Sequence, residues 1–481
     1  MLPPPPGEGG GGGSEAQSLA MSKYCPAYPR PVTSRWTAWW RALFGRDSLL
    51  EQLTEKSYRM QMGEARVPGH EFHTVNDPEA VRKVLVERHR NFPKHRFMDD
   101  LLRPLLGRSI FTTNGDEWAR QRRLMEPAFE QTRMEHAFPL MRDAAIALLE
   151  RLRRVPDGSD CDLEAELTHF TADVIFRTIF SKPLAADDAD RIFRAFAAFQ
   201  RAAPKATMPQ YRPRWWQALA GDGAQRATRE AATEIRALLQ RQVAPRHAAF
   251  HAGQASGEVD ILASLLAARD PDSGRALGVE ELVNEIAVLY LAGHETSASA
   301  LAWTLHFLAH DPEVQQRVQA EVDGVLAGGG AIEVEQLRDL DLTRRLFREV
   351  LRLYPPLSFL VREATADTCL RDKTVHAGAT VVVSPWLIHR HRQYWERPDE
   401  FDPDRFLTES GRASLRTAYL PFSLGPRVCV GAGFALQEAT LVLALILREF
   451  AVAPLAGHEP MPMARLSLRS DIGVRLKLQR R

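Results

Sequence analysis

Ten residues near the C-terminus constrain this chain more than any other stretch. An apolar segment with helical spacing, 432–450, follows them directly, and they read Phe422-Ser423-Leu424-Gly425-Pro426-Arg427-Val428-Cys429-Val430-Gly431. A cysteine just before a helix N-terminus, with Arg427 and backbone N–H groups nearby, is expected to have a lowered pKa and to act as a thiolate ligand. Glycine at 425 and 431 accepts positive φ and leaves room for a flat ligand. The alternative, a buried free cysteine in a turn, is favoured if Cys429 is considered alone.

The spacing F-x-x-G-x-R-x-C-x-G resembles the haem-binding motif of the cytochrome P-450 family, and every fixed position is filled. The resemblance covers the chain from about residue 40 to the end, through four motifs in order. It implies a mainly α-helical fold with a small β region around a buried haem b. Cys429 would be the axial thiolate of the iron, and the residues around the haem would include Phe422, Gly425, Arg427 and Gly431.

The segment 279–310 predicts the longest helix, with A-G-H-E-T-S in its middle. A glycine inside a helix costs roughly 1 kcal/mol relative to alanine, so Gly293 is expected to have a structural or functional role. By the resemblance, the helix crosses the haem, Ala292 and Gly293 leave room for O2, Thr296 hydrogen-bonds O2, and Glu295 relays protons. The alternative is a small-residue helix crossing with a threonine that bonds its own backbone.

A second helix, predicted over 341–354, carries Glu349 and Arg352 on one face. Such a pair is usually a weak surface salt bridge. The resemblance implies instead a buried structural pair that is completed by Arg405 from a later loop. These residues would hold the haem-side scaffold together and take no part in the chemistry.

Three further residues are candidates for the haem propionates. Trp118 and Arg122 are four apart on a helix that begins at 114–116, and Arg362 follows a predicted strand at 357–361. A guanidinium suits a carboxylate, so the resemblance implies propionate contacts for all three. Arg120 and Arg123 would lie off that face, toward solvent.

The substrate pocket is predicted from apolar residues in segments that the resemblance places beside the haem. Pro93, Pro104 and Gly107 predict short helices and loops over 91–111, a strand pair is predicted over 375–385, and a hairpin over 464–469. Ordinary core packing is the alternative for each candidate. The candidates are Phe97, Leu101, Leu105, Leu357, Phe359 and Leu466.

A phenylalanine stripe at 193, 196 and 199 has helical spacing and is more often core than pocket. Prolines at 204, 209 and 213 break the pattern, and the resemblance implies a mobile lid over the substrate channel in this region.

Composition and charge narrow the function classes. The 481 residues contain 62 Lys and Arg against 61 Asp and Glu, so the overall charge does not suggest nucleic acid. The four scattered cysteines indicate a reducing compartment and a cytoplasmic location. No run of about 20 apolar residues is present, and the absence of an N-terminal anchor points to a soluble bacterial-type protein. The aromatic segment 36–44 is expected to cover a substrate entrance rather than contact a membrane.

The predicted organisation is a disordered low-complexity tail at 1–22 and a single catalytic domain at 23–481 that acts as a monomer. The predicted function is a haem-thiolate monooxygenase that inserts one atom of O2 into a hydrophobic organic substrate. Its electrons would come from NAD(P)H through a reductase and a separate ferredoxin or flavodoxin. The alternatives are a peroxygenase or isomerase on the same fold, and a non-catalytic haem sensor or carrier. Fatty acid, terpene, carotenoid and polyketide substrates all remain open.

A basic patch is expected to dock the electron donor on the thiolate side. It would consist of Arg120, Arg123, Arg344, Arg345, Arg348 and Arg427. Such a patch would steer an acidic partner. Arginines that merely solvate exposed helix faces are the alternative.

Overall fold

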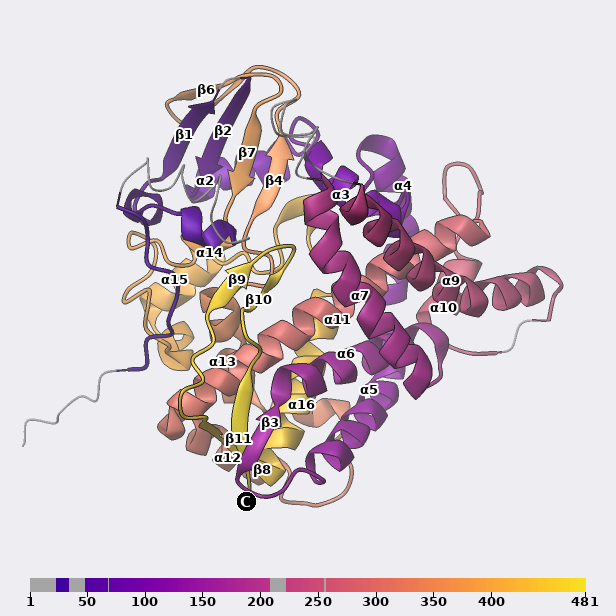
Figure 1. The fold of residues 1–481 in the computed structure, drawn as a ribbon, viewed down its shortest axis with the longest axis vertical. Coiled ribbons are helices and arrows are strands. Elements are labelled where there is room, and N and C mark those ends of the chain that lie inside the picture. The colour runs from indigo at the N-terminus through magenta and orange to yellow at the C-terminus, as the bar shows by residue number, and fades with distance from the viewer. Residues whose placement is uncertain (1–22, 34–47, 68, 208–221, 255–256) are drawn as a thin grey trace, which may run out of the picture.

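The structure is a computed structural model that describes residues 23–33, 48–67, 69–207, 222–254 and 257–481 (Figure 1). The predicted tail at 1–22 and the aromatic segment 36–44 lie outside these residues. The α-helices are α2 Pro78–Arg82, α3 Arg96–Leu106, α4 Gly115–Met125, α5 Gln131–Leu152, α6 Leu163–Phe180, α7 Ala186–Thr207, α9 Gly223–His251, α10 Ile261–Ala267, α11 Val279–His310, α12 Pro312–Val325, α13 Asp341–Leu353, α14 Pro385–Ile388, α15 Glu409–Thr417 and α16 Ala432–Glu449.

The strands form four small sheets, and the largest lies at one end of the molecule, at the upper left of Figure 1. That sheet has the order β1-β2-β7-β4, in which β2 and β7 run parallel and the other pairs antiparallel. The smaller sheets are β3-β11-β8, β9-β10 and β5-β6. The strands are β1 Met62–Val67, β2 His70–Val75, β3 Ser159–Asp162, β4 Leu360–Glu363, β5 Thr368–Leu370, β6 Lys373–Val375, β7 Thr380–Val383, β8 Phe450–Pro454, β9 Pro462–Ala464, β10 Leu468–Ser470 and β11 Arg475–Arg480.

The helix α11 runs through the middle of the molecule and has the bounds that the sequence predicts (Figure 1). Most of its side chains are buried against α6, α9, α13 and α16. It ends because Asp311 leaves the helical region and caps the next helix by accepting a hydrogen bond from the Val314 N–H. A helix buried on nearly every side can place chosen side chains at the centre of the fold.

Three predictions about secondary structure are wrong. The segment 91–111 contains one continuous helix, α3, with Pro104 inside it, and the helix ends at Gly107 (φ 53°). The predicted strand pair over 375–385 does not form, because β6 pairs with β5 and β7 pairs with β2 and β4. Pro204 lies within α7 and does not break it.

The phenylalanine stripe and the sequence that follows it are only partly described. Phe196 and Phe199 are buried, as core packing predicts. The predicted lid region around Pro209 and Pro213 lies outside the described residues. The hairpin predicted over 464–469 is confirmed by the antiparallel pairing of β9 with β10.

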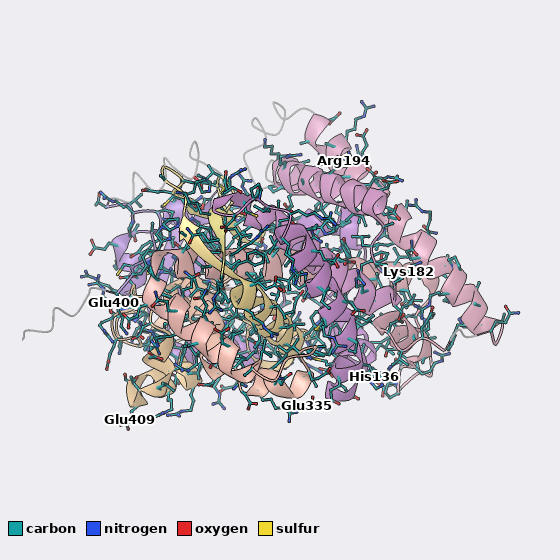
Figure 2. The ribbon with its side chains drawn as sticks, turned by 90° about the horizontal axis from the view of Figure 1, so that it is seen from below. His136, Lys182, Arg194, Glu335, Glu400 and Glu409 are labelled. Carbon is teal, nitrogen blue, oxygen red and sulfur yellow. The ribbon has the colours of Figure 1, made fainter. Side chains whose placement is uncertain are left out.

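Charged side chains such as Lys182, Arg194, Glu335 and Glu409 lie on the outside of the ribbon (Figure 2). Among the described helices, none is both long and apolar enough to cross a membrane.

Candidate active site

Cys429 lies in a tight loop immediately before α16. The Cys429 N–H donates to the Phe422 carbonyl (2.9 Å), and the Val428 N–H donates to the Gly425 carbonyl (3.0 Å). Gly425 has φ 71°, and a Cβ there would lie 2.5 Å from the Leu85 carbonyl oxygen, so only glycine fits. Gly431 has φ −91°, so the expectation of positive φ holds for Gly425 and is wrong for Gly431.

The thiol of Cys429 does not have the lowered pKa that the sequence predicts. Cys429 exposes part of its surface, but protein surrounds it on most sides, and this enclosure raises the pKa of the thiol. A hydrogen bond from the Gly431 N–H and the charge of Arg122 act in the opposite direction without overcoming it. The chain alone therefore favours a thiol, and a bound cation is needed to hold a thiolate.

Three residues in the middle of α11 differ from their buried neighbours. Ala292 is exposed, and Gly293 and Thr296 are half-buried. The Thr296 hydroxyl donates to the Ala292 carbonyl (2.7 Å), the backbone bond that the sequence left open as the alternative. A Cβ on Gly293 would lie 3.1 Å from the Ile175 side chain, so this glycine permits close packing of α6 on α11. That reason differs from the predicted room for O2.

Glu295 is buried, and its carboxylate faces the β9–β10 hairpin. The Ser467 hydroxyl donates to Oε1 of Glu295 (2.5 Å), and Arg469 Nε lies 3.8 Å from the same oxygen. The acid and the neighbouring threonine thus make contacts with different groups, although they are adjacent in sequence.

A cluster of three cations lies beside the cysteine loop, in which Arg362 is buried and Lys94 and Arg427 are half-buried. The guanidinium carbon of Arg427 lies 4.4 Å from the ring centroid of Trp118. The side chains of Arg362 and Lys94 donate to backbone carbonyls, and the two residues are joined by an isolated β-bridge. None of these three cations has an ion pair with a carboxylate in the described part of the chain.

Burial lowers the pKa of each cation in this cluster, and repulsion from neighbouring cations lowers the pKa of Arg362 and Lys94 further. The pKa of Arg427 falls to about 10 through burial, and that of Arg362 falls to about 10 through burial and the charge of Arg427. The pKa of Lys94 is lowered by burial and by both arginines. Grouping buried like charges is unfavourable unless an anion joins them. The cluster therefore fits a ligand that carries carboxylates.

The sequence did not point to Lys94, and it predicted a propionate contact for Arg122. Lys94 lies in a loop without periodicity, and only the β-bridge to Arg362 reveals its position. Arg122 is not in the cation cluster, because it pairs with Glu126 (2.6 Å) and donates to the Val428 carbonyl (2.7 Å). It therefore anchors the cysteine loop, and Trp118 contributes by stacking under Arg427.

The structure brings Glu349, Arg352 and Arg405 together in the interior. Arg352 donates to both carboxylate oxygens of Glu349 (2.8 Å each), and Arg405 Nε donates to Oε1 (3.0 Å). The side chains of Glu349 and Arg352 are fully buried. Further donors of the two arginines bind backbone carbonyls between residues 389 and 400. The three residues thus join α13 to the chain that leads to the cysteine loop.

The apolar pocket candidates separate into two groups. Phe97, Leu357, Phe359 and Leu466 are half-buried. Leu101 and Leu105 are buried in the main core, and Leu105 has no exposed surface. Core packing, the alternative weighed for each candidate, is what the structure shows for these two leucines.

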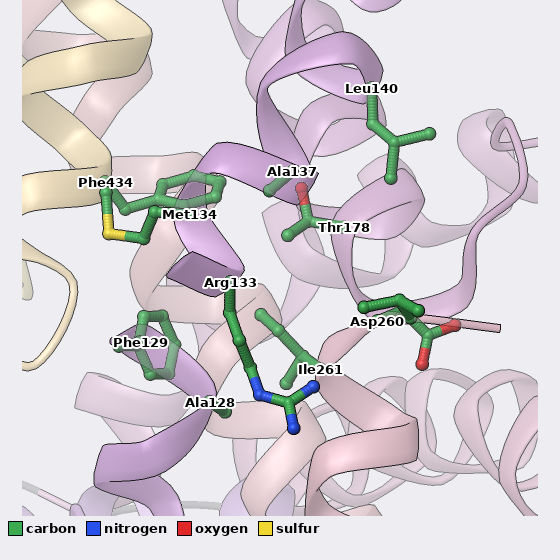
Figure 3. Close-up of a pocket in the computed structure, with 11 residues that line it drawn as sticks. Ala128, Phe129, Arg133, Met134, Ala137, Leu140, Thr178, Asp260, Ile261 and Phe434 are labelled. Carbon is green, nitrogen blue, oxygen red and sulfur yellow. The ribbon is translucent and has the colours of Figure 1, made fainter. Parts of the chain in front are cut away.

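A small pocket of about 20 Å³ lies elsewhere, between the start of α16 and the turn that precedes α5 (Figure 3). Phe129, Met134 and Phe434 give it an apolar wall, and Arg133 lies at its edge (Figure 3). None of the predicted site residues lines it, and its volume suffices only for one or two water molecules. It is therefore too small to hold an organic substrate.

Most of the arginines predicted to form the basic docking patch are paired with acids. Arg120 is 15% exposed, not directed to solvent, and lies near Asp270 and Glu281. Arg345 is 12% exposed and pairs with Asp341 and Asp404. The other pairs are Arg123 with Asp270 and Asp272, and Arg344 with Asp341. The predicted basic excess is therefore wrong at these four positions.

The residues present fit a haem. An accessible cysteine without a disulfide partner can ligate iron, and the three cations, which form no ion pair with a carboxylate of the described residues, can bind two propionates. In a haem of this kind the iron would lie at Cys429 and the carboxylates at Lys94, Arg362 and Arg427.

Comparisons with known proteins agree with this fit. A family model described as Cytochrome P450 matches residues 26–476. Cyclooctatin synthase of Streptomyces melanosporofaciens is 32% identical over 81% of this chain and 83% of its own length. Pentalenene oxygenase of Streptomyces avermitilis is 31% identical (84% and 87%), and cytokinin hydroxylase of Arabidopsis thaliana is 30% identical (84% and 78%). The crystal structure of the cytochrome P450DA heme domain matches with TM-score 0.76 and 28% identity, over 88% of this chain and 90% of that one.

Proposed function

Because the chain belongs to the cytochrome P450 family and is a monooxygenase, we propose that it inserts one oxygen atom from O2 into a hydrophobic organic substrate by hydroxylation or epoxidation. The observation that supports this most is an accessible cysteine loop beside a cation cluster that forms no ion pair with any acid among the described residues. Haem b, when bound, supplies the activation of O2 at its iron.

The chain holds and shields this cofactor through named groups. Cys429 would ligate the iron, and Lys94, Arg362 and Arg427 would bind the propionates. The triad of Glu349, Arg352 and Arg405 supports the loop without touching the reaction. Phe422 packs against the core beside the cysteine loop, where it excludes water.

Glu295 and Thr296 would take part in proton delivery. A carboxylate that is buried and hydrogen-bonded to Ser467 is held in one orientation. The Thr296 hydroxyl donates to the Ala292 carbonyl, which leaves its oxygen free to accept a proton or a hydrogen bond. We therefore assign proton supply to Glu295 and the ordering of the reacting oxygen to Thr296.

Members of this family generally need redox partners, and we assign electron supply to a separate ferredoxin or flavodoxin that NAD(P)H reduces through a reductase. Phe97, Leu357, Phe359 and Leu466 supply apolar surface for the substrate. The protein would act as a single catalytic domain (23–481), as a cytoplasmic monomer, a location that its four free cysteines support.

The test begins with the haem-loaded protein. Its ferrous CO complex should show the red-shifted Soret band of thiolate ligation, Cys429→Ser should lose that band, and Cys369→Ser should keep it. Retention of the band in Cys429→Ser would overturn the ligand assignment.

Turnover then separates the enzyme classes. Product that depends on NADPH, a ferredoxin and its reductase supports the monooxygenase with a separate donor. Product from peroxide alone would favour a peroxygenase. Substrates are found by screening apolar compounds for shifts of the Soret band.

A further inference from the structure

Two histidines lie side by side at the end of α9. His247 and His251 are four residues apart, and the helix ends at His251. Their Nε2 atoms face each other at 3.1 Å, and their ring centroids are 4.3 Å apart. His251 is exposed and His247 is half-buried, so the pair lies at the surface. This end of α9 lies at the right edge of the molecule in Figure 1, and none of the predicted haem-site residues belongs to this helix.

The distance between the two nitrogens fits a metal chelate. A metal ion that bonds both Nε2 atoms at the usual zinc–nitrogen length of about 2.0–2.1 Å has an N–metal–N angle of roughly 100°. This angle lies between the approximately 90° of octahedral or square-planar coordination and the approximately 109° of tetrahedral coordination. Two histidines at this helical spacing are also the zinc ligands of the H-E-x-x-H motif. The geometry therefore suits a divalent transition metal.

The neighbours of the pair hold one ring in place and present a compensated charge. The ring of Phe250 meets the ring of His251 edge-on, with the centroids 5.7 Å apart and an interplanar angle of 88°. Arg246, which precedes His247, pairs with Glu258 (3.0 Å) and Asp260 (2.6 Å). The two carboxylates neutralise this arginine, so its charge does not oppose a cation at the histidines.

Helical spacing alone does not make such a site, as a second pair in this chain shows. His306 and His310 are also four residues apart, on α11, with ring centroids 4.4 Å apart. His306 is buried, however, and Nδ1 of His310 donates to the His306 carbonyl (2.9 Å). Only the α9 pair, among these two, combines facing nitrogens with access from solvent.

We propose that His247 and His251 bind one divalent transition-metal ion through both Nε2 atoms. Zn²⁺, Ni²⁺ and Cu²⁺ form the class that fits, because these ions favour imidazole nitrogen. Each ring binds as the neutral imidazole with its proton on Nδ1. No third His, Cys, Asp or Glu completes the group in the part of the chain that the structure describes. Water fills the remaining coordination positions, and the ion cross-links the last turn of α9.

The experiment titrates haem-loaded protein without an affinity tag with Ni²⁺ at neutral pH, followed by calorimetry. Ni²⁺ is chosen because it does not oxidise the free cysteines. One ion should bind per chain. His247→Gln and His251→Gln should each weaken binding about tenfold or more and to a similar extent, because the second ligand of a chelate binds at a high effective concentration. His136→Gln, at an exposed position of α5, is the matched control and should keep the wild-type affinity.

X-ray absorption at the nickel edge identifies the ligands independently of affinity. The wild-type complex should show two imidazoles, and His251→Gln should show no more than one. The Soret band should not change on adding Ni²⁺, because the ion binds away from the cysteine loop. Equal affinities of wild type and His251→Gln, or a wild-type spectrum with fewer than two imidazoles, would overturn the proposal. A loss of affinity in His136→Gln as large as that in His251→Gln would do the same.

Discussion

The guanidinium of Arg427 stacks on Trp118 at 4.4 Å, yet its Nε and Nη1 donate to no group in the described part of the chain. Stacking fixes the plane of the guanidinium, so its free donors point in a defined direction. A hydrogen bond to a charged group contributes about 1.5–3 kcal/mol. Arg427→Gln should therefore speed haem loss about 10- to 150-fold, measured as transfer to excess apomyoglobin.

The propionate assignment for the cation cluster has a direct control. Lys94→Gln should also speed haem loss, whereas Arg416→Gln, an exposed arginine on α15, should not. Haem dimethyl ester carries no propionate charge, so the difference between Arg427→Gln and wild type should shrink with that cofactor. An equal difference with both cofactors would contradict the assignment.

Thr296 and Thr304 allow a matched comparison on one helix. Each hydroxyl donates to the carbonyl four residues earlier at 2.7 Å, but Thr296 is half-buried and Thr304 is fully buried. Thr296→Ala should retain haem and lower the product formed per NADPH, with peroxide released instead. Thr304→Ala should keep the wild-type product yield. Equal yields from wild type and Thr296→Ala would count against the role of Thr296.

Breaking the buried triad should destabilise the fold. Glu349→Gln leaves Arg352 and Arg405 as buried charges without compensation, a change that typically costs about 3–5 kcal/mol. The variant should unfold at a lower urea concentration and should retain less haem. Arg66→Gln removes an exposed ion pair with Glu64 and should shift the unfolding free energy by less than about 1 kcal/mol. Similar urea midpoints for the two variants would contradict a structural role for the triad.

Sequence patterns predicted the elements that depend on local signals. The uninterrupted apolar run of 279–310 and the Asp311-Pro312 cap predicted α11 and the start of α12 with their observed bounds. Pairing between distant strands could not be predicted, because β7 pairs with β2, some 300 residues earlier in the chain, whereas the β9–β10 hairpin joins strands that are close in sequence and was predicted. The partners of β-strands are set by tertiary packing, which has no short-range signal.

In the candidate site, too, local contacts could be predicted from the sequence and contacts between distant segments could not. The motif spacing brought out Cys429 and the Glu349–Arg352 pair, whose contacts are local. It missed Lys94, and it assigned Arg120 and Arg345 to a basic docking patch. The carboxylates of Asp270 and Asp404, which lie near Arg120 and Arg345 respectively, come from distant segments, although Arg345 also pairs with Asp341 of its own helix. The sequence also contained no sign that Ile175 of α6 lies closest to a Cβ on Gly293, and the room for O2 at this glycine stays a prediction.

His389 makes the free energy of unfolding depend on pH in the acidic range. Its Nδ1 donates to the Arg352 carbonyl (3.0 Å) and its Nε2 accepts from the Leu420 N–H (2.7 Å), so the ring is neutral. Burial, with the charges of Arg352 and Arg390, lowers its pKa from 6.5 to about 3. The unfolded chain therefore binds more protons between these values, and the free energy of unfolding falls as pH drops below about 6.5, by about 2 kcal/mol at pH 5 from this group.

The matching experiment compares urea unfolding at pH 7 and pH 5 and fixed ionic strength. His389→Gln should be less stable than wild type at pH 7 but should lose about 2 kcal/mol less on acidification. Glu285 and Glu438, whose pKa values burial raises to about 8, act with the opposite sign, because the folded chain holds their protons. Their contribution is the same in both proteins and cancels in the comparison. His70→Gln, at an exposed position of β2, is the control and should lose as much unfolding free energy on acidification as the wild type. If His389→Gln also lost as much as the wild type, His389 would not be the cause of the pH dependence.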